Sequence, residues 1–321
     1  MLLSVRNLTT SFKTAHGDLT AVDDVSFDIE AGQTLGLVGE SGCGKSSLAK
    51  TLIRLVKPTA GRITLDDQDI AGLSESELKG VRPKIQMIFQ DPYSSLNPRK
   101  TVGQIIEEPL HVHRIGTGLE KQERVRWLMD RVGLRSEAFH SFPHELSGGQ
   151  RQRVGIARAL TLQPKLVVCD EPVSALDISI RAQVLNLLTS LQDEFGFSYL
   201  FISHDLSVVR HVSDHVAVMY LGKLVELGDN SEIWEHPAHP YTRALMAAVP
   251  NMQRTTKREV GTGVLPGDLP SPLSPPAGCR FHTRCPIAES RCTTSEPVYR
   301  ENNRGHWVAC HVASTLKKET S

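Results

Sequence analysis

The sequence predicts an α/β protein whose core is a parallel, doubly wound β-sheet. The first observation is a set of short apolar runs at 35–38, 166–169, 199–203 and 216–220, which are typical of strands buried on both faces. The second is that stretches with helical spacing separate the last three runs, as expected when helices connect parallel strands. The third is a glycine-rich segment directly after the first run, where a strand would turn into a helix.

Local patterns predict the remaining elements in order. Apolar residues alternate over 2–8 and 21–29 around a Gly17-Asp18 turn signal, which predicts two strands at the N-terminus. Three- and four-residue spacing predicts helices over 46–56, 178–194 and 206–212, and a mostly helical subdomain over about 91–163. We expect one large domain over 1–254, a Gly/Pro-rich linker over 255–278 and a cysteine-rich tail over 279–321.

Composition excludes several classes of protein. The chain has 321 residues, and its 36 Lys and Arg balance its 36 Asp and Glu. This balance argues against a protein whose main task is to coat nucleic acid through a basic face. It is 40% hydrophobic and 22% charged, so it is neither disordered nor a membrane bundle by composition. No apolar run approaches the roughly 18 residues of a membrane span, and we expect a cytoplasmic protein.

The segment 39–46 has the complete G-x-x-x-x-G-K-[ST] pattern of a phosphate-binding loop. The glycines let backbone N–H groups converge on phosphates at a helix N-terminus, Lys45 contacts the β- and γ-phosphate oxygens, and the Ser46 hydroxyl ligates Mg²⁺. ATP with Mg²⁺ is therefore the expected ligand. The expected contacts are Gly39, Ser41, Gly42, Cys43, Gly44, Lys45, Ser46 and Ser47.

Two further segments have residues suited to ATP hydrolysis or to phosphate binding. The run 166–171 ends in Asp170, expected near Mg²⁺, and Glu171, expected to position and deprotonate the attacking water. The run 146–150 places Ser147, Gly149 and Gln150 at a second glycine-rich helix start, where an ordinary helix cap at Ser147 is the alternative.

Together with Gln90, Asp177 and His204, these motifs resemble, in order and spacing, the ATP-binding cassette (ABC) ATPases over residues 1 to about 250. The resemblance implies catalytic roles for Glu171, His204 and Gln90, with Mg²⁺ held by Ser46, Gln90 and Asp170. It implies that Ser147 and Gly149 act on the ATP of a partner subunit, and that Asp177 lies at the dimer seam. Phe12 stands where the family stacks an aromatic ring on adenine; a core phenylalanine is the alternative. For His204 the alternative is a cap on the strand ending at residue 203.

Segments 88–99, 232–237 and 239–245 resemble the ATPases of oligopeptide and dipeptide importers, and most closely their second ATPase subunit. Related systems carry nickel, glutathione or other small peptides. The resemblance implies a heterodimer with another ABC ATPase, two membrane-spanning permease subunits and an extracytoplasmic peptide-binding protein. The chain would then be a peripheral protein on the cytoplasmic face of the membrane, and nucleic acid would not be among its partners.

Four of the six cysteines crowd into the C-terminal tail, as Cys279, Cys285, Cys292 and Cys310. This pattern resembles the C-terminal extension of the same importer branch. Four thiolates suit a [4Fe–4S] cluster, which we expect, or zinc; unligated thiols are the other alternative. His282, His306 and His311 are substitute ligands.

Two other functions stay open at this point. A soluble ABC ATPase acting on nucleic acid or ribosomes is disfavoured by the neutral charge and the single cassette. A nucleotide-binding regulator without hydrolysis is disfavoured because both Asp170 and Glu171 are present.

Overall fold

The computed structural model describes residues 1–248, 267–303 and 305–313, and its strands form two sheets. The N-terminal sheet is antiparallel, in the order β2-β1-β4-β5. Its strands are β1 (Leu3–Thr14), β2 (Gly17–Ile29), β4 (Ala60–Leu65) and β5 (Gln68–Asp69). Leu3 is paired with both Ile29 and Leu65, and all three side chains are buried against the core sheet. The two predicted strands at the N-terminus are confirmed.

The core sheet is mixed, with the order β11-β12-β10-β9-β3-β8-β7-β6. Its strands are β3 (Thr34–Val38), β6 (Ile85–Ile88), β7 (Leu166–Asp170), β8 (Ser198–Ile202), β9 (His215–Tyr220), β10 (Lys223–Asp229), β11 (Arg300–Asn303) and β12 (His306–Val308). Strands β6, β7, β8, β3 and β9 are parallel, whereas β10, β12 and β11 add antiparallel to the β9 edge. The wholly parallel core sheet predicted from the sequence is therefore wrong beyond β9.

A tight turn explains this departure. Only Leu221 and Gly222 connect β9 to β10, and both have a positive φ, of 42° and 85°. A two-residue turn with left-handed backbone closes an antiparallel hairpin, because a parallel connection needs a crossover of a dozen or more residues.

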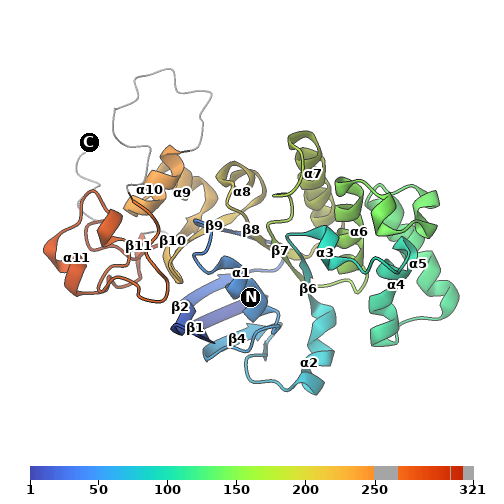
Figure 1. Ribbon diagram of the computed structural model, residues 1–321, viewed down its shortest axis with the longest axis horizontal. Helices are drawn as coiled ribbons and strands as arrows, with labels where there is room; N and C mark the ends of the chain where they lie inside the picture. Colours follow the sequence, from blue (N-terminus) through green and yellow to red (C-terminus); the bar gives the residue numbers. More distant parts are fainter. Residues whose placement is uncertain (249–266, 304, 314–321) are drawn as a thin grey trace.

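Helices cover the core sheet, and Figure 1 shows those of the predicted helical subdomain gathered at the β6 end, away from the C-terminal segment. These are α3 (Pro92–Ser95), α4 (Val102–His113), α5 (Gly118–Arg131) and α6 (Gly148–Leu160). The others are α1 (Lys45–Leu52), α2 (Glu75–Val81), α7 (Ile178–Phe195), α8 (Leu206–Val212), α9 (Asn230–Glu235), α10 (Pro240–Ala247) and α11 (Ser290–Thr294). Within the described residues, none of these helices is long and apolar enough to cross a membrane.

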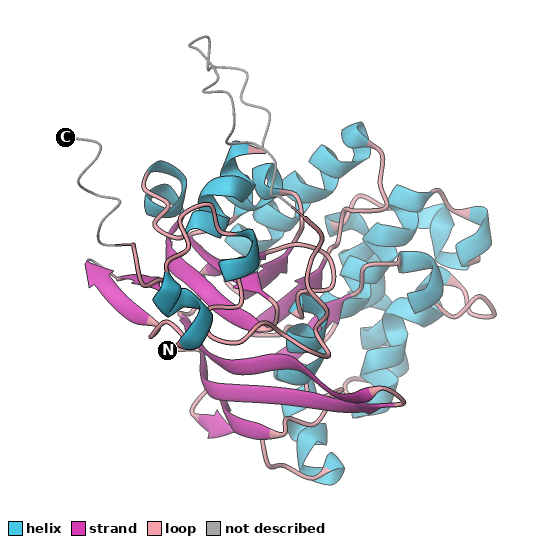
Figure 2. Ribbon diagram, turned by 60° about the vertical axis from the view of Figure 1, so that its left-hand side comes forward, coloured by secondary structure: helices cyan, strands magenta, loops and turns pink. Residues whose placement is uncertain are grey.

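The C-terminal segment, which we define as residues 267–313 without 304, packs on the rest of the protein. Strand β12 pairs with β10, so that Val308 lies opposite Glu226 and the segment extends the core sheet (Figure 2). The first part of the expected linker, 255–266, lies outside the described residues; the part from 267 to 278 contains no helix or strand. The C-terminal segment therefore joins the sheet that also contains β3 and the loop that follows it.

Candidate nucleotide-binding site

The phosphate loop connects β3 to α1 at the carboxyl edge of the parallel strands. Two of its glycines are required by close packing. A Cβ at Gly39 would lie 2.2 Å from the Met219 carbonyl oxygen, and one at Gly44 would lie 2.1 Å from that of Ala21. Gly44 also has φ +110°, which residues with a side chain rarely adopt. The loop is therefore pressed against β9 and β2 in a shape that only glycine allows.

Lys45 is the cation of this loop, and it is buried, with 5% of its area exposed. Its Nζ donates hydrogen bonds to the carbonyl oxygens of Gly39 at 2.7 Å and Glu40 at 3.0 Å. A buried ammonium held by neutral carbonyls is poised to exchange them for phosphate oxygens, because hydrogen bonds between charged partners are stronger. This arrangement fits a nucleotide with an anionic triphosphate.

Ser46 and Asp170 form the adjoining polar pair. The Ser46 hydroxyl donates a 3.0 Å hydrogen bond to Asp170 Oδ1, and the Asp170 side chain is buried at 4% exposure. Burial raises the pKa of Asp170, against the opposing effect of the Ser46 hydrogen bond, and the neighbouring Glu171 charge raises it further. A hydroxyl and a buried carboxylate whose charge lacks full compensation are hard oxygen ligands that fit Mg²⁺. Bound there, Mg²⁺ would neutralise charge on the phosphates.

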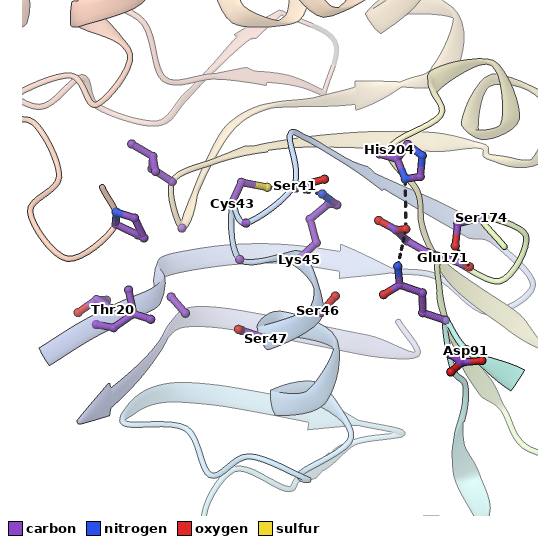
Figure 3. A pocket seen from close by; sticks show the side chains of 18 of the residues that line it. Thr20, Ser41, Cys43, Lys45, Ser46, Ser47, Asp91, Glu171, Ser174 and His204 are labelled. Carbon is purple, nitrogen blue, oxygen red and sulfur yellow. Dashed lines mark hydrogen bonds and ion pairs between the residues drawn. The ribbon is translucent and has the colours of Figure 1, made fainter. Parts of the chain in front are cut away.

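Glu171 lies between the other two predicted catalytic side chains (Figure 3). Its Oε2 is 3.1 Å from His204 Nδ1 and accepts a 3.0 Å hydrogen bond from Gln90 Nε2. The backbone of Glu171 has φ +48°, and its N–H donates to the Ile202 carbonyl at 3.0 Å. This left-handed kink at the end of β7 directs a mostly buried carboxylate into the pocket.

These groups share a pocket of about 720 Å³. Its lining includes Ser41 to Ser47, Gln90, Glu171 and His204 from the predicted set, while Gly39 and Asp170 lie immediately behind it. The site prediction left out Asp91, Ser174 and Ala175, which line the pocket near Gln90 and Glu171. It also missed the walls beyond the phosphate loop, which are Leu19, Thr20, Ala21, Leu221, Gly222 and Pro272. They come from β2, the β9–β10 turn and the C-terminal segment. No local motif marks them, because tertiary packing alone brings them to the pocket.

Phe12 lies on β1 opposite Leu19, is partly buried, and is absent from the described residues that line this pocket. Its adenine-stacking role stays a prediction.

The second glycine-rich helix start lies outside this pocket. Ser147 is exposed and caps α6: its Oγ accepts the Gln150 N–H at 3.3 Å, and Gln150 Oε1 accepts the Ser147 N–H at 2.9 Å. A Cβ at Gly149 would lie 2.7 Å from Ile180, and Asp177 is exposed just before α7. The structure leaves Ser147, Gly149, Gln150 and Asp177 away from this chain's own pocket, and their action on a partner's nucleotide stays a prediction.

The predicted metal cluster of the C-terminal tail is wrong. Among the described residues, which include all four tail cysteines, no group of three His, Cys, Asp or Glu side chains could hold a metal ion. The thiols act as small apolar side chains: Cys279 and Cys285 pack against the main core, and Cys310 packs in a cluster with Val308 and Val312. Burial raises the pKa of Cys279 to about 11 and also raises those of Cys285 and Cys310, which favours thiols over metal-binding thiolates.

The carboxyl edge of the sheet therefore brings together a buried lysine, the Glu171 carboxylate in the pocket and the Asp170 carboxylate behind it. This arrangement defines an ATPase of the phosphate-loop class. Residues 22–174 match the ABC transporter family, and residues 225–292 match the C-terminal region of oligopeptide/dipeptide transporters. The chain belongs to the ABC transporter family, as an ATPase that uses ATP and Mg²⁺.

Relatives and solved structures agree with this family. The chain is 56% identical to the oligopeptide transport ATP-binding protein AppF of Bacillus subtilis, over 94% of this chain and 92% of the relative. It is 49% identical to OppF of Haemophilus influenzae, over 97% and 96%. The dimeric cassette MJ0796 bound to ADP and Pi matches with a TM-score of 0.66 at 29% identity, over 71% of this chain and 99% of that one. The Clostridium perfringens cbiO1 matches with 0.65 at 29%, over 73% and 91%.

Proposed function

We propose that this chain is the ATP-binding and hydrolysing subunit of an importer of dipeptides or oligopeptides. The observation that carries the proposal is the pairing of a complete ATPase pocket with a C-terminal region of the oligopeptide/dipeptide transporter type, residues 225–292. The chain matches proteins named for oligopeptide transport over nearly its full length, at 56% and 49% identity, which supports the same cargo class. The chain would work at the cytoplasmic face of the membrane, beside two permease subunits and an extracytoplasmic peptide-binding protein.

We propose the following roles for the site residues, which their positions around the pocket support. Lys45 and the loop N–H groups bind the phosphates. Ser46, Asp170 and the Gln90 amide oxygen would hold Mg²⁺. Glu171 acts as the general base on the attacking water, and His204, 3.1 Å from its carboxylate, contacts the γ-phosphate and keeps Glu171 oriented.

A second ATPase subunit completes the proposal. The exposed Ser147 and the half-buried Gly149 lie outside this chain's own pocket and are suited to the nucleotide of a partner, as is the exposed Asp177. The similar solved cassette MJ0796 is described as a dimer, which supports such a pairing. Within the chain, we assign 1–254 to the ATP-binding domain, 255–278 to the linker and 279–321 to the C-terminal extension.

The test is a tagged pull-down from detergent-solubilised membranes, followed by mass spectrometry and ATPase assays of the eluate. We expect two permease subunits, a second ABC ATPase, and turnover that peptides stimulate once the binding protein is added. Stimulation by nickel or glutathione instead would assign another cargo. A soluble eluate without permeases would contradict the importer and leave only the ATPase.

A further inference from the structure

An arginine of the C-terminal segment forms hydrogen bonds with the phosphate loop. Arg284 donates two parallel hydrogen bonds to Glu40, the second residue of the loop, from NH1 to Oε2 at 2.7 Å and from NH2 to Oε1 at 3.0 Å. The Arg284 side chain is only 5% exposed. The Glu40 carboxylate raises the pKa of Arg284 further above its already high ordinary value. A bidentate, largely buried pair of this kind fixes both geometry and charge.

The turn that carries Arg284 rests on an aromatic cluster. Phe281, which is 1% exposed, packs edge-on against Tyr220 and tilted against Tyr241, with centroids 5.3 Å and 5.4 Å away. Tyr241 in turn accepts the backbone N–H of Glu40 at its hydroxyl, at 2.9 Å. Glu40 is therefore held at its side chain by Arg284 and at its main chain by Tyr241.

Arg280, in the same turn, holds the other arm of the loop. It donates to the Leu221 carbonyl and pairs with Asp23. The neighbouring Gly222 N–H donates to the Cys43 carbonyl at 2.8 Å. Leu221 and Gly222 also line the pocket, so the two arginines support the loop at Glu40 and, through this turn, at Cys43.

We propose that Arg284 is a positioning residue for the nucleotide site and that, through it, the C-terminal segment sets the affinity of this chain for ATP. The inference rests on the proposed function of the pocket. The Glu40 carbonyl also accepts from Lys45, so a shift of Glu40 moves the cation of the loop. Without Arg284, the Glu40 carboxylate would stand uncompensated beside a site for an anionic triphosphate, and its repulsion would weaken ATP binding.

The experiment measures the dissociation constant for ATP, and KM and kcat for hydrolysis, on the full chain. We expect Arg284→Gln to raise the dissociation constant and KM about tenfold with kcat within twofold, because Glu171 keeps its contacts. Adding Glu40→Gln to Arg284→Gln removes the bare carboxylate and should restore affinity to within about threefold. A purely structural role of Arg284 would show no such rescue. Arg291→Gln breaks an exposed Arg–Glu pair in the same segment and serves as the matched control, with wild-type values.

A measurement on the wild-type chain keeps the proposal testable if Arg284→Gln fails to fold. Coupling between sites is reciprocal, so ATP should slow amide exchange in residues 281–285 while leaving α11 unchanged. Unaltered affinity in Arg284→Gln, absence of rescue, or absence of this protection would each overturn the inference. A wild-type chain that does not bind ATP would instead overturn the proposed function.

Discussion

The two glycine-rich helix starts of this chain, at α1 and at α6, look alike in sequence and differ in their surroundings. Before α1, Gly39 and Gly44 lie against other strands, Lys45 is buried, and the site walls come from distant segments of the same chain. Before α6, Ser147 is exposed and satisfied by its own capping box. The comparison teaches that a phosphate motif forms a site only where other elements enclose it, so the α6 start would bind a nucleotide only if another subunit supplied such walls.

The largest effect should come from Glu171→Gln, at the enclosed site. We expect kcat to fall about 10³-fold, because general-base catalysis contributes 10² to 10⁴, with ATP affinity unchanged since the amide keeps the shape of the side chain. Steady-state hydrolysis and equilibrium nucleotide binding check this. Glu123→Gln, on the exposed face of α5, is the control. Wild-type turnover in Glu171→Gln would show that another group is the base.

Next in size is Lys45→Ala, which should weaken ATP binding about 100-fold. Each hydrogen bond to a charged group contributes about 1.5–3 kcal/mol, and Lys45 would lose its contacts with the phosphates. The dissociation constant is the measurement. Lys50→Ala, an exposed lysine on the same helix, is the matched control and should bind ATP as wild type does. Equal losses in both variants would mean that α1 charge in general, and not Lys45, attracts the nucleotide.

The α6 start should behave in the opposite way. We expect Ser147→Ala to leave ATP affinity of the isolated chain unchanged and to lower turnover of the assembled ATPase pair about tenfold, the effect of one lost hydrogen bond to a charged group. Ser74→Ala removes the same kind of capping box from α2, far from the pocket, and separates cap loss from site loss. A weaker affinity in isolated Ser147→Ala would place Ser147 in this chain's own site and break the comparison.

Sequence reasoning reached the enclosed site because its chemistry is local. The motif from Gly39 to Ser46 and the strand ending in Asp170 and Glu171 carry their own signals, and four of the five parallel strands follow from apolar runs, whereas β6 was not predicted. The walls at Leu19, Leu221 and Pro272 could not be predicted, since only tertiary packing places them there. The antiparallel strands β10 to β12 were missed for the same reason. The cysteines misled, because their spacing does not reveal that burial raises the pKa of Cys279, Cys285 and Cys310 and favours neutral thiols.

The smallest expected effect is on the free energy of unfolding, which the burial of the Asp170 carboxylate lowers at neutral pH. Burial raises the pKa of Asp170 above its unfolded value, so the unfolded state binds fewer protons and stability falls as pH rises through the range between the two. Asp170→Asn should therefore raise the free energy of unfolding of the nucleotide-free chain at pH 7 by about 1 kcal/mol, and by nothing below the unfolded pKa.

Asp66 gives the opposite sign and completes the test. Hydrogen bonds from Lys165 and Lys84 lower the pKa of Asp66 to about 2, so its contribution is present above the ordinary pKa of 3.8 and is lost as pH falls toward 2. Asp66→Asn should thus lower stability at pH 7, where Asp170→Asn raises it; urea unfolding at pH 7 and pH 3 measures both. Destabilisation by Asp170→Asn at pH 7 would mean that its hydrogen bond with Ser46 outweighs the cost of burying its charge. The buried Asp170 charge would then already be compensated in the nucleotide-free chain, and Mg²⁺ would not be needed to offset it.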